Sequence, residues 1–361
     1  MRNILVTGGA GFIGSNFVRY LLKNDSTVHI YNLDLLTYAG SLQNLNDLPD
    51  PERHTFLRGD ICDRALVDQI LHEYQIETIV HFAAETHVDR SILGPAQFIQ
   101  TNVVGTFTLL DAARQAWLVD RILPTEQVHF HHVSTDEVYG TLKPEDPAFS
   151  ETTSYAPSSP YSASKASSDH LVRAYFHTYG LPVTITNCSN NYGPYQFPEK
   201  LIPLMILNAV EGRPLPVYGD GRQIRDWLYV EDHCEAIWLV ANQGKKGETY
   251  NVGGNNQPTN LEIIHKICTG LDQKLPTSAL IPREALIRYV TDRLGHDRRY
   301  AMNIQKISAN LGWAPRHNLE TGLDQTLDWY LNHPEWITAV NQKPDYTEWM
   351  EQNYSLRGAK K

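Results

Sequence analysis

Short apolar runs recur along the first half of the chain, and amphipathic stretches separate them. The runs lack polar alternation, which is typical of strands buried on both faces of a sheet. Strands alternating with helices predict βαβ units and an α/β, Rossmann-like fold with a doubly wound parallel sheet. The predicted strands are 2–7, 28–33, 78–82, 128–133 and 182–186, and the predicted helices are about 12–22, 65–74, 95–117 and 161–179.

The alternation stops near residue 187, where glycine and proline become frequent. We therefore predict a Rossmann domain over residues 1–186 and a smaller C-terminal α/β domain over residues 187–361. Residues 226–240 have the pattern of a strand, a turn and a helix, and we expect the chain to return to the first domain near residues 226–250. Residues 356–361 are expected to form a loose basic tail.

Composition restricts the class of protein. Of 361 residues, 42% are hydrophobic and 20% charged, as in globular proteins. The net charge of −10 argues against binding to nucleic acid or to an anionic membrane. No apolar run approaches the roughly 20 residues of a membrane span, and we expect no signal peptide. The four cysteines form no C-x-x-C pair, which argues against zinc or a disulfide framework and favours a cytoplasmic protein.

A glycine-rich motif follows the first predicted strand and opens the first helix. Gly8, Gly11 and Gly14 have the spacing G-x-x-G-x-x-G. Such glycines permit a tight turn and a close approach of pyrophosphate to the helix N-terminus. Asp34 ends the second strand, where a carboxylate binds the ribose 2′-hydroxyl and repels a 2′-phosphate. The motif therefore predicts NAD rather than NADP; a tight turn without a ligand is the alternative for the glycines alone.

Tyr161 and Lys165 are four residues apart on a predicted helix, so they lie on one face. Ser159 and Pro160 read as the cap and first turn of that helix. A lysine cation near a phenol favours the phenolate and lowers its pKa, which makes Tyr161 a candidate base for a hydroxyl proton. The alternative is an exposed pair of little consequence.

Asp136 and Glu137 are adjacent carboxylates upstream of that pair. Together, an acid and a base can remove a proton from one carbon and protonate a departing hydroxyl. Consecutive strand residues point to opposite faces, so a turn must begin here if both are to serve. Without context these residues would be interpreted as a solvated loop. Beside Tyr161 and Lys165 they indicate oxidation combined with dehydration.

Fifteen histidines raise the question of a metal site. No H-E-x-x-H or comparable spacing occurs. His131 and His132 lie at the end of a predicted buried strand, and His81 and His87 flank an alanine pair. We predict structural roles for these four residues and no metal ion.

In combination, these features resemble the extended short-chain dehydrogenase/reductase family. Thr135-Asp136-Glu137 narrows the resemblance to the dTDP-glucose 4,6-dehydratases, and further matches cover residues 81–91, 187–194, 197–201, 225–227 and 292–300. Two positions depart from the family pattern, with Thr86 where serine is expected and Leu294 where proline is expected.

The resemblance implies conversion of dTDP-glucose to dTDP-4-dehydro-6-deoxy-glucose and water with recycled NAD, a homodimer formed through residues 95–117 and the helix after Tyr161, and a role in deoxysugar biosynthesis. Its catalytic residues are Thr135, Asp136, Glu137, Tyr161 and Lys165. The implied cofactor-binding residues are Gly8, Gly11, Phe12, Ile13, Gly14, Asp34, Leu36, Thr37, Asp60, Ile61, Ala83, Ala84, Thr101, Tyr161, Lys165 and Asn191. The implied substrate-binding residues are Thr86, Asn190, Lys200, Leu201, Pro216, Tyr218, Arg225, Asn260, Asp292 and His296.

Several alternatives stay open at this point. A nucleotide-sugar 4-epimerase would use NAD with Tyr161 and Lys165 but would not need Asp136 and Glu137. A decarboxylase would need a group for a sugar carboxylate, and a GDP-mannose dehydratase would be expected to prefer NADP. A non-enzymatic NAD-dependent sensor on this fold is a further alternative. The sequence leaves the choice between thymine and uracil open, and likewise that between rhamnose and an antibiotic sugar.

Overall fold

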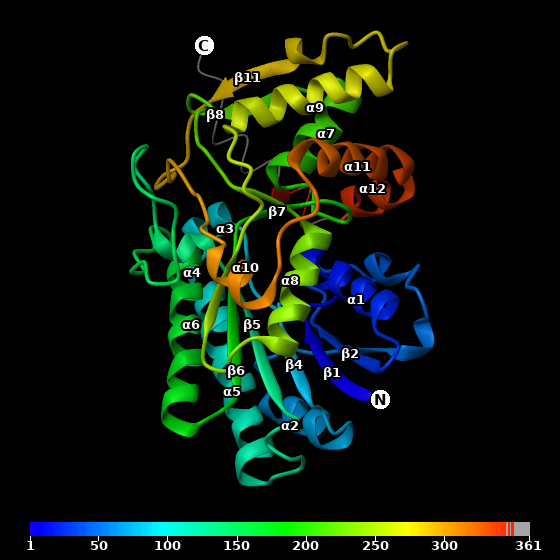
Figure 1. Ribbon diagram of the computed structural model, residues 1–361. Helices are drawn as coiled ribbons and strands as arrows, with labels where there is room; N and C mark the ends of the chain where they lie inside the picture. Colours follow the sequence, from blue (N-terminus) through cyan, green and yellow to red (C-terminus); the bar gives the residue numbers. More distant parts are fainter. Residues whose placement is uncertain (344–345, 347, 350–361) are drawn as a thin grey trace.

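Seven parallel strands form the central sheet of the computed structural model, which describes residues 1–343, 346 and 348–349 (Figure 1). Their order across the sheet is β10-β6-β5-β4-β1-β2-β3. The strands are β1 (Arg2–Thr7), β2 (Val28–Asp34), β3 (His54–Arg58), β4 (Thr78–His81), β5 (His129–Thr135), β6 (Val183–Cys188) and β10 (Thr249–Val252). The predicted doubly wound α/β class is confirmed. The strand order reverses between β1 and β4, where ligands of such folds bind.

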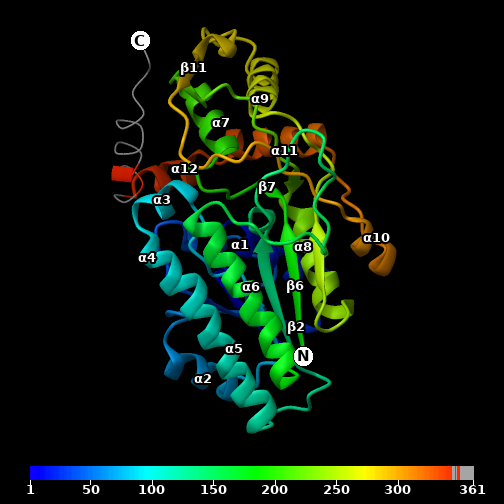
Figure 2. The ribbon, with the colours of Figure 1, turned by 90° about the vertical axis from the view of Figure 1, so that its left-hand side faces the viewer.

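Helices cover both faces of this sheet (Figure 2). On one face α1 (Phe12–Asn24) contacts α8 (Val230–Gln243), and Phe17 and Ile237 belong to the same buried cluster. On the other face α5 (Thr106–Arg114) packs between α2 (Arg64–Glu73) and α6 (Pro160–Tyr179). The sheet is therefore buried on both sides, as its unbroken apolar runs predicted.

The helix predicted over residues 95–117 is not a regular α-helix. The chain passes without a break through α4 (Pro95–Phe98), the π-helix η3 (Ile99–Gly105), α5 and the π-helix η4 (Gln115–Val119). A Cβ atom on Gly105 would lie 2.5 Å from Ile61 Cδ1, so this helix approaches the loop after β3 closely. Apolar spacing alone does not distinguish such widened turns from α-helix.

The segment predicted to return to the sheet does so. Residues 227–229 form β9 (Trp227–Tyr229), α8 follows, and β10 then pairs with β6 at the edge of the sheet. The division of the chain at residue 186 stays a prediction.

The upper part of the molecule in Figure 1 contains α7 (Leu201–Glu211), α9 (Asn260–Lys274), α11 (Leu319–Asn332) and α12 (Pro334–Asn341), which share one buried apolar cluster. Two parallel strand pairs accompany them, β7 (Asn190–Tyr192) with β9 and β8 (Leu215–Tyr218) with β11 (Ile287–Val290). The remaining short elements are α3 (Val88–Leu93), α10 (Gln305–Leu311), η1 (Leu42–Leu45), η2 (Pro51–Arg53), η5 (Asp136–Tyr139) and η6 (Arg283–Leu286).

Two further observations concern the described part of the chain. None of its helices is long and apolar enough to cross a membrane. The basic tail predicted for residues 356–361 lies outside the described residues.

Candidate active site

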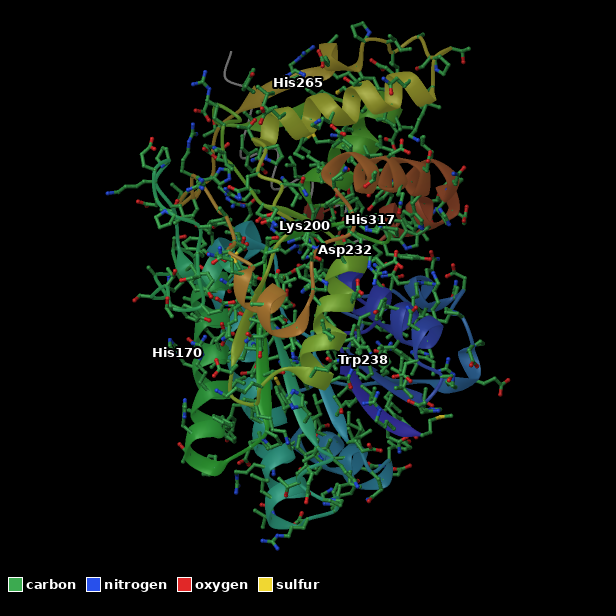
Figure 3. All side chains as sticks on the ribbon, viewed as in Figure 1. His170, Lys200, Asp232, Trp238, His265 and His317 are labelled. Carbon is green, nitrogen blue, oxygen red and sulfur yellow. The ribbon has the colours of Figure 1, made fainter. Side chains whose placement is uncertain are left out.

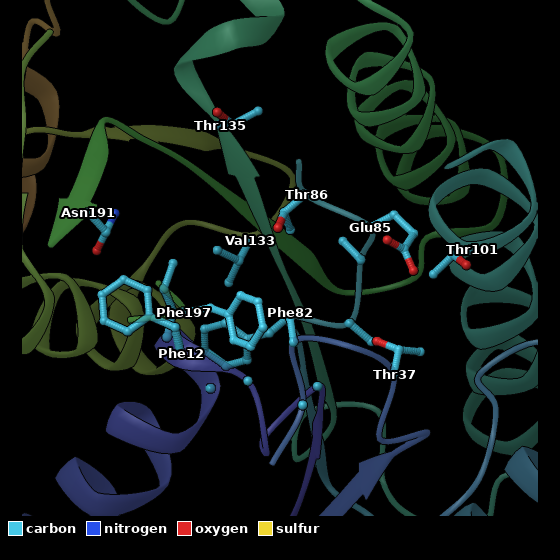
Figure 4. Close-up of a pocket in the computed structure, with 18 of the residues that line it drawn as sticks. Phe12, Thr37, Phe82, Glu85, Thr86, Thr101, Val133, Thr135, Asn191 and Phe197 are labelled. Atoms are coloured by element: carbon cyan, nitrogen blue, oxygen red, sulfur yellow. The ribbon is translucent and has the colours of Figure 1, made fainter. Parts of the chain in front are cut away.

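A cleft of about 290 Å³ lies along the carboxyl ends of the central strands, and Figure 4 shows Phe12, Thr37, Thr101, Thr135 and Asn191 around it. A second cleft of about 190 Å³ adjoins it and extends into the upper part of the molecule. The two clefts share Thr86, Glu137, Asn190, Asn191, Gln196, Glu199 and Lys200. The site therefore has two connected compartments that meet at Glu137.

The glycine loop shapes the floor of the first cleft. Gly8 has a φ of +74°, and a Cβ there would lie 2.7 Å from the Ala83 backbone nitrogen. A Cβ on Gly14 would lie 2.2 Å from the Gly8 carbonyl oxygen. Gly11 caps α1 without a side-chain hydrogen bond, so the first turn of α1 presents its backbone N–H groups to the cleft. These groups and the helix dipole suit an anion such as a pyrophosphate.

Asp34 also lines the first cleft. Its Oδ2 accepts a hydrogen bond from Ala10 N at 2.9 Å, and its Oδ1 accepts one from Leu36 N at 2.8 Å. Burial raises the pKa of Asp34, and these two bonds oppose the rise. The carboxylate is thus fixed in position, with lone pairs left for a ribose hydroxyl.

Leu36 is the one predicted cofactor residue that does not line the cleft in the described chain. Its φ of 59° turns the backbone, and its N–H is engaged by Asp34. The Leu36 backbone therefore holds Asp34 in place, and direct contact of Leu36 with the cofactor stays a prediction. The other predicted cofactor residues all line the cleft.

The turn required by the two adjacent carboxylates is present. The 3₁₀ helix η5 starts at Asp136, directly after β5, so both Asp136 and Glu137 reach the cleft. Thr135 Oγ1 accepts a hydrogen bond from Glu137 N at 3.3 Å and donates one to Asp136 Oδ1 at 3.3 Å. Thr135 therefore fixes the orientation of the pair.

The two carboxylates differ in their electrostatic surroundings. Asp136 is 2% exposed, and its Oδ2 has no hydrogen-bond partner among the described residues. Burial and the charge of Glu137 raise the pKa of Asp136 well above its ordinary value. Burial also raises the pKa of Glu137, but the cations Arg293, Arg225 and Lys200 oppose that rise. Asp136 is therefore suited to donate a proton and Glu137 to accept one.

Tyr161 and Lys165 both line the cleft from the first turns of α6. That helix begins as predicted, with Ser159 capping Ser162 N and Pro160 in the first turn. Lys165 Nζ donates to the Val133 carbonyl at 2.9 Å. Burial lowers the pKa of Lys165, and the buried Asp169 carboxylate opposes that fall.

The predicted effect of Lys165 on Tyr161 is not found for the protein chain by itself. Burial raises the pKa of Tyr161 well above its ordinary value, and the nearby Glu137 carboxylate raises it further. The Lys165 ammonium is directed to the Val133 carbonyl. The pKa of Tyr161 is therefore set mainly by burial and by the charge of Glu137, which both raise it. A positive charge close to the phenol is needed before the phenolate becomes accessible.

Two buried histidines of β5, His129 and His131, are engaged by hydroxyl groups, whereas His132 Nε2 lies 3.2 Å from Asp169 Oδ1. His131 Nδ1 is 2.8 Å from Thr184 Oγ1, and its Nε2 is 3.1 Å from Thr186 Oγ1. No group of three or more His, Cys, Asp or Glu side chains suited to a metal ion occurs within residues 1–343, 346 and 348–349.

Cations and polar groups line the second cleft. Lys200 lies between the lower and upper parts of the molecule (Figure 3), and its Nζ donates to the Thr86 carbonyl at 3.0 Å. The Arg225 guanidinium lies 4.2 Å from the centroid of the Tyr300 ring and donates to the Ile224 and Asp297 carbonyls. The predicted substrate residues that line this cleft are Thr86, Asn190, Lys200, Leu201, Pro216, Tyr218, Arg225, Asn260 and His296.

Asp292, which was predicted as a substrate residue, does not line the cleft. Its Oδ1 is 2.6 Å from His296 Nδ1, and its Oδ2 accepts a hydrogen bond from Gln223 Nε2 at 3.0 Å. Asp292 therefore orients His296, which does face the cleft.

The structure adds residues that sequence reasoning did not select. Arg293 lines the second cleft and acts on Glu137 through its charge. Glu199 lines both clefts, and its Oε2 accepts a hydrogen bond from Arg90 Nε at 3.1 Å. Arg293 and Glu199 lie inside segments that carry the family resemblance, and this resemblance was the signal that could have identified them. Further residues that line the clefts and were not predicted as site residues are Glu85, Gln196, Phe197, His87 and Trp227.

Comparisons with known proteins match nucleotide-sugar 4,6-dehydratases over most of the chain. The family model described as GDP-mannose 4,6 dehydratase matches residues 5–326. A dTDP-glucose 4,6-dehydratase of Salmonella typhimurium is 54% identical over 362 residues, 98% of this chain and 99% of that protein. One of Xanthomonas campestris pv. campestris is 57% identical over 340 residues, 94% of this chain and 96% of that protein. The crystal structure of a Bacillus anthracis dTDP-glucose 4,6-dehydratase in complex with NAD has 46% identity and a TM-score of 0.82, covering 94% of this chain and 100% of that one.

Proposed function

The chain belongs to the dTDP-glucose 4,6-dehydratases of the extended short-chain dehydrogenase/reductase family, and on that premise we propose that it converts dTDP-glucose to dTDP-4-dehydro-6-deoxy-glucose and water. One observation carries the proposal. The buried Asp136 and the half-buried Glu137 line the same cleft as Tyr161 and Lys165, at the junction of the two compartments. An oxidation site and an elimination site therefore face one substrate.

NAD fits the first cleft. The glycine loop leaves no room for a Cβ at Gly8 or Gly14, and the first turn of α1 offers N–H groups to a pyrophosphate. Asp34 supplies a carboxylate for the ribose. Bound NAD would take a hydride from C4 of the sugar and later return it to C6, so the overall reaction is redox-neutral.

The side chains of this chain then have distinct tasks. The positive charge of an oxidised nicotinamide in the first cleft would favour the Tyr161 phenolate, which accepts the proton of the sugar 4-hydroxyl, and Thr135 hydrogen-bonds the same oxygen. A ketone at C4 acidifies the C5 proton, so Glu137 can remove that proton, and Asp136 protonates the departing 6-hydroxyl. With the return of hydride to C6, a proton is added back at C5, so that the sugar loses one water overall. Burial and the neighbouring charge of Glu137 raise the pKa of Asp136 well above its ordinary value, which supports its role as the acid.

The second cleft suits the nucleotide diphosphate. Arg225, Lys200 and Arg293 place three cations on this side of Glu137. A planar guanidinium can form two parallel hydrogen bonds to phosphate oxygens. Pro216 and Tyr218 lie farther along the cleft and offer an apolar slot for the base. One methyl group in such a slot is worth about 1–3 kcal/mol, which is the margin available between thymine and uracil.

The test is incubation of the purified protein with dTDP-glucose and no added cofactor, followed by mass analysis of the nucleotide sugar. Loss of one water with the bound NAD unchanged at the end supports the proposal. Conversion to the galactose isomer at unchanged mass would instead identify a 4-epimerase. Absence of any reaction would contradict the activity for this substrate.

Replacing Asp34 by alanine is expected to weaken NAD binding about 10- to 100-fold and to reduce the preference for NAD over NADP. The substitution removes a charged hydrogen-bond acceptor, worth about 1.5–3 kcal/mol, and the charge that repels a 2′-phosphate. NAD and NADP titrations of the cofactor-stripped protein measure both effects. Asp63→Ala is the matched control, because Asp63 caps α2 outside the cleft. Unchanged NAD affinity in Asp34→Ala would remove Asp34 from the ribose site.

We also propose that two copies of the chain associate through η3, α5 and α6. The support is a set of exposed apolar side chains on these helices, namely Ile99 (49% exposed), Val104 (37%), Phe107 (46%) and Tyr179 (51%). Exposed apolar side chains gathered on neighbouring helices are typical of protein interfaces.

The Phe107→Glu variant is therefore expected to sediment as a monomer at concentrations where the parent protein sediments as a dimer, because a charge would be buried between the copies. Tyr289→Glu is the control, because Tyr289 is 51% exposed but lies on β11, far from these helices along the chain. A parent protein that sediments as a monomer would contradict the dimer.

The downstream use of the product is a further proposal. A 4-keto-6-deoxy sugar is a precursor for deoxysugars, and the family resemblance points to rhamnose.

We also propose a cytoplasmic location, because the four cysteines, Cys62, Cys188, Cys234 and Cys268, are all free thiols.

A further inference from the structure

Helix α12 contacts the segment that follows β2, although nearly 300 residues separate them: Trp336 and Asn44 are 292 positions apart. We call residues 34–45 the cofactor loop, because it contains Asp34, Thr37 and Gly40 of the first cleft. The loop ends in η1, which holds Asn44. Its position decides whether Asp34 and Thr37 face the bound cofactor.

A continuous series of hydrogen bonds joins α12 to Asp34. Trp336 Nε1 donates to Asn44 Oδ1 at 2.7 Å, and Asn44 Nδ2 donates to the Ala10 carbonyl at 2.9 Å. Ala10 N in turn donates to Asp34 Oδ2 at 2.9 Å. Asn44 is 2% exposed and Trp336 5% exposed, so water does not compete freely for these bonds.

A second link lies next to the first. Lys343 follows α12, and its Nζ donates to the carbonyls of Tyr38 at 3.2 Å and Gly40 at 2.6 Å. Both acceptors belong to the cofactor loop. The C-terminal part of the chain therefore holds the loop at two points, one through the side chain of Asn44 and one through backbone carbonyls.

Neither Trp336 nor Asn44 is among the described residues that line the first cleft. Their contacts are directed at the loop and at the Ala10 carbonyl of the glycine turn. Any effect they have on a cofactor is therefore indirect and passes through Ala10, Asp34 and the cofactor loop.

We propose that Trp336 and Asn44 are positioning residues that keep the cofactor loop closed over NAD, so that the cofactor stays bound through the whole catalytic cycle. The proposal rests on the proposed function, because a dehydratase of this type must return to C6 the hydride it took from C4. On this proposal NAD leaves when the loop opens, so the affinity and the release rate follow the population of the open loop. A link from α12 lowers that population.

Trp336→Phe separates the hydrogen bond from the packing. The Trp336 ring lies among aromatic rings, with centroids 5.1 Å from Trp329 and 6.1 Å from Tyr330, and a phenyl ring keeps most of this contact. The indole N–H is lost, and Asn44 Oδ1 is left buried without its donor. Trp313→Phe is the matched control, because Trp313 is 3% exposed and its Nε1 has no hydrogen-bond partner within the described chain.

The experiment measures release of NAD from the holoenzyme into excess buffer, without dTDP-glucose. Trp336→Phe is expected to release NAD about 3- to 10-fold faster than the parent, as expected for loss of one buried hydrogen bond, and Trp313→Phe at the parent rate. Hydrogen exchange of the cofactor-stripped protein gives a second readout: residues 35–45 should exchange faster in Trp336→Phe, and α6 should not.

An unchanged release rate in Trp336→Phe, or equal acceleration in Trp313→Phe, would overturn the proposal. Should Trp336→Phe fail to fold, Lys343→Met breaks the second link while keeping the aliphatic stem, and the same acceleration is expected. Because no sugar substrate is present, failure of the dehydratase activity would not alter these outcomes. A parent protein that retains no NAD would count against the cofactor assignment instead.

Discussion

The Glu137→Gln enzyme is expected to lose water elimination about 10²- to 10⁴-fold while retaining oxidation at C4. Glutamine has nearly the shape of glutamate, and its backbone N–H keeps the bond to Thr135 Oγ1, so η5 stays in place. The amide cannot accept the C5 proton. The first proton transfer belongs to Tyr161, so the substrate should stop at the keto stage with the nicotinamide partly reduced.

Two signals measure this outcome together. Absorbance of the reduced nicotinamide should rise on addition of dTDP-glucose, and the mass of the nucleotide sugar should show no loss of water. Glu145→Gln is the control, since Glu145 is exposed in the loop after η5. Full dehydration by Glu137→Gln would remove Glu137 from the role of base.

Substrate binding should survive this substitution. The charge of Glu137 is surrounded by those of Arg293, Arg225 and Lys200. Its neutralisation leaves these cations free to interact with the diphosphate. A weaker affinity of Glu137→Gln for the nucleotide sugar would therefore indicate that the Glu137 carboxylate also binds the sugar, in addition to its role as the base.

Local motifs made much of the site predictable. The positions of Gly8, Gly14 and Asp34 are set by the turn, the helix start and the strand end to which they belong. Their spacing along the chain is therefore enough to predict how they are arranged. The same holds for Asp136 and Glu137, whose turn is set by Thr135 at the end of β5. Where structure depends on neighbours in sequence, the sequence is informative.

The parts that could not be predicted depend on distant segments. Arg293 acts on Glu137 from a loop 156 residues later in the chain. The pKa of Tyr161 depends on burial and on Glu137 rather than on its helical neighbour Lys165. The bond between Trp336 and Asn44 has no counterpart in any local pattern. Asp292 was predicted to face the ligand but orients His296, because loop spacing does not tell which side of a loop faces a cleft.

Replacing Tyr161 by phenylalanine is expected to block the reaction one step earlier, with a loss of about 10²- to 10⁴-fold in turnover. The ring packs against Phe98 at a centroid distance of 6.2 Å, and phenylalanine keeps that contact. Only the phenolic oxygen is lost, which as the phenolate accepts the 4-hydroxyl proton. Addition of dTDP-glucose should then produce neither water loss nor reduced nicotinamide, whereas Tyr179→Phe, an exposed position of the same helix, should behave like the parent.

The order of the two steps makes the double variant decisive. If oxidation at C4 must precede removal of the C5 proton, Tyr161→Phe combined with Glu137→Gln should behave like Tyr161→Phe alone. The reduced nicotinamide seen in Glu137→Gln should disappear, because the ketone that acidifies C5 never forms. A double variant that still reduces the nicotinamide would show that another group takes the hydroxyl proton. Lys165 as the neutral amine would then be the first candidate, since its side chain lines the same cleft and burial lowers its pKa.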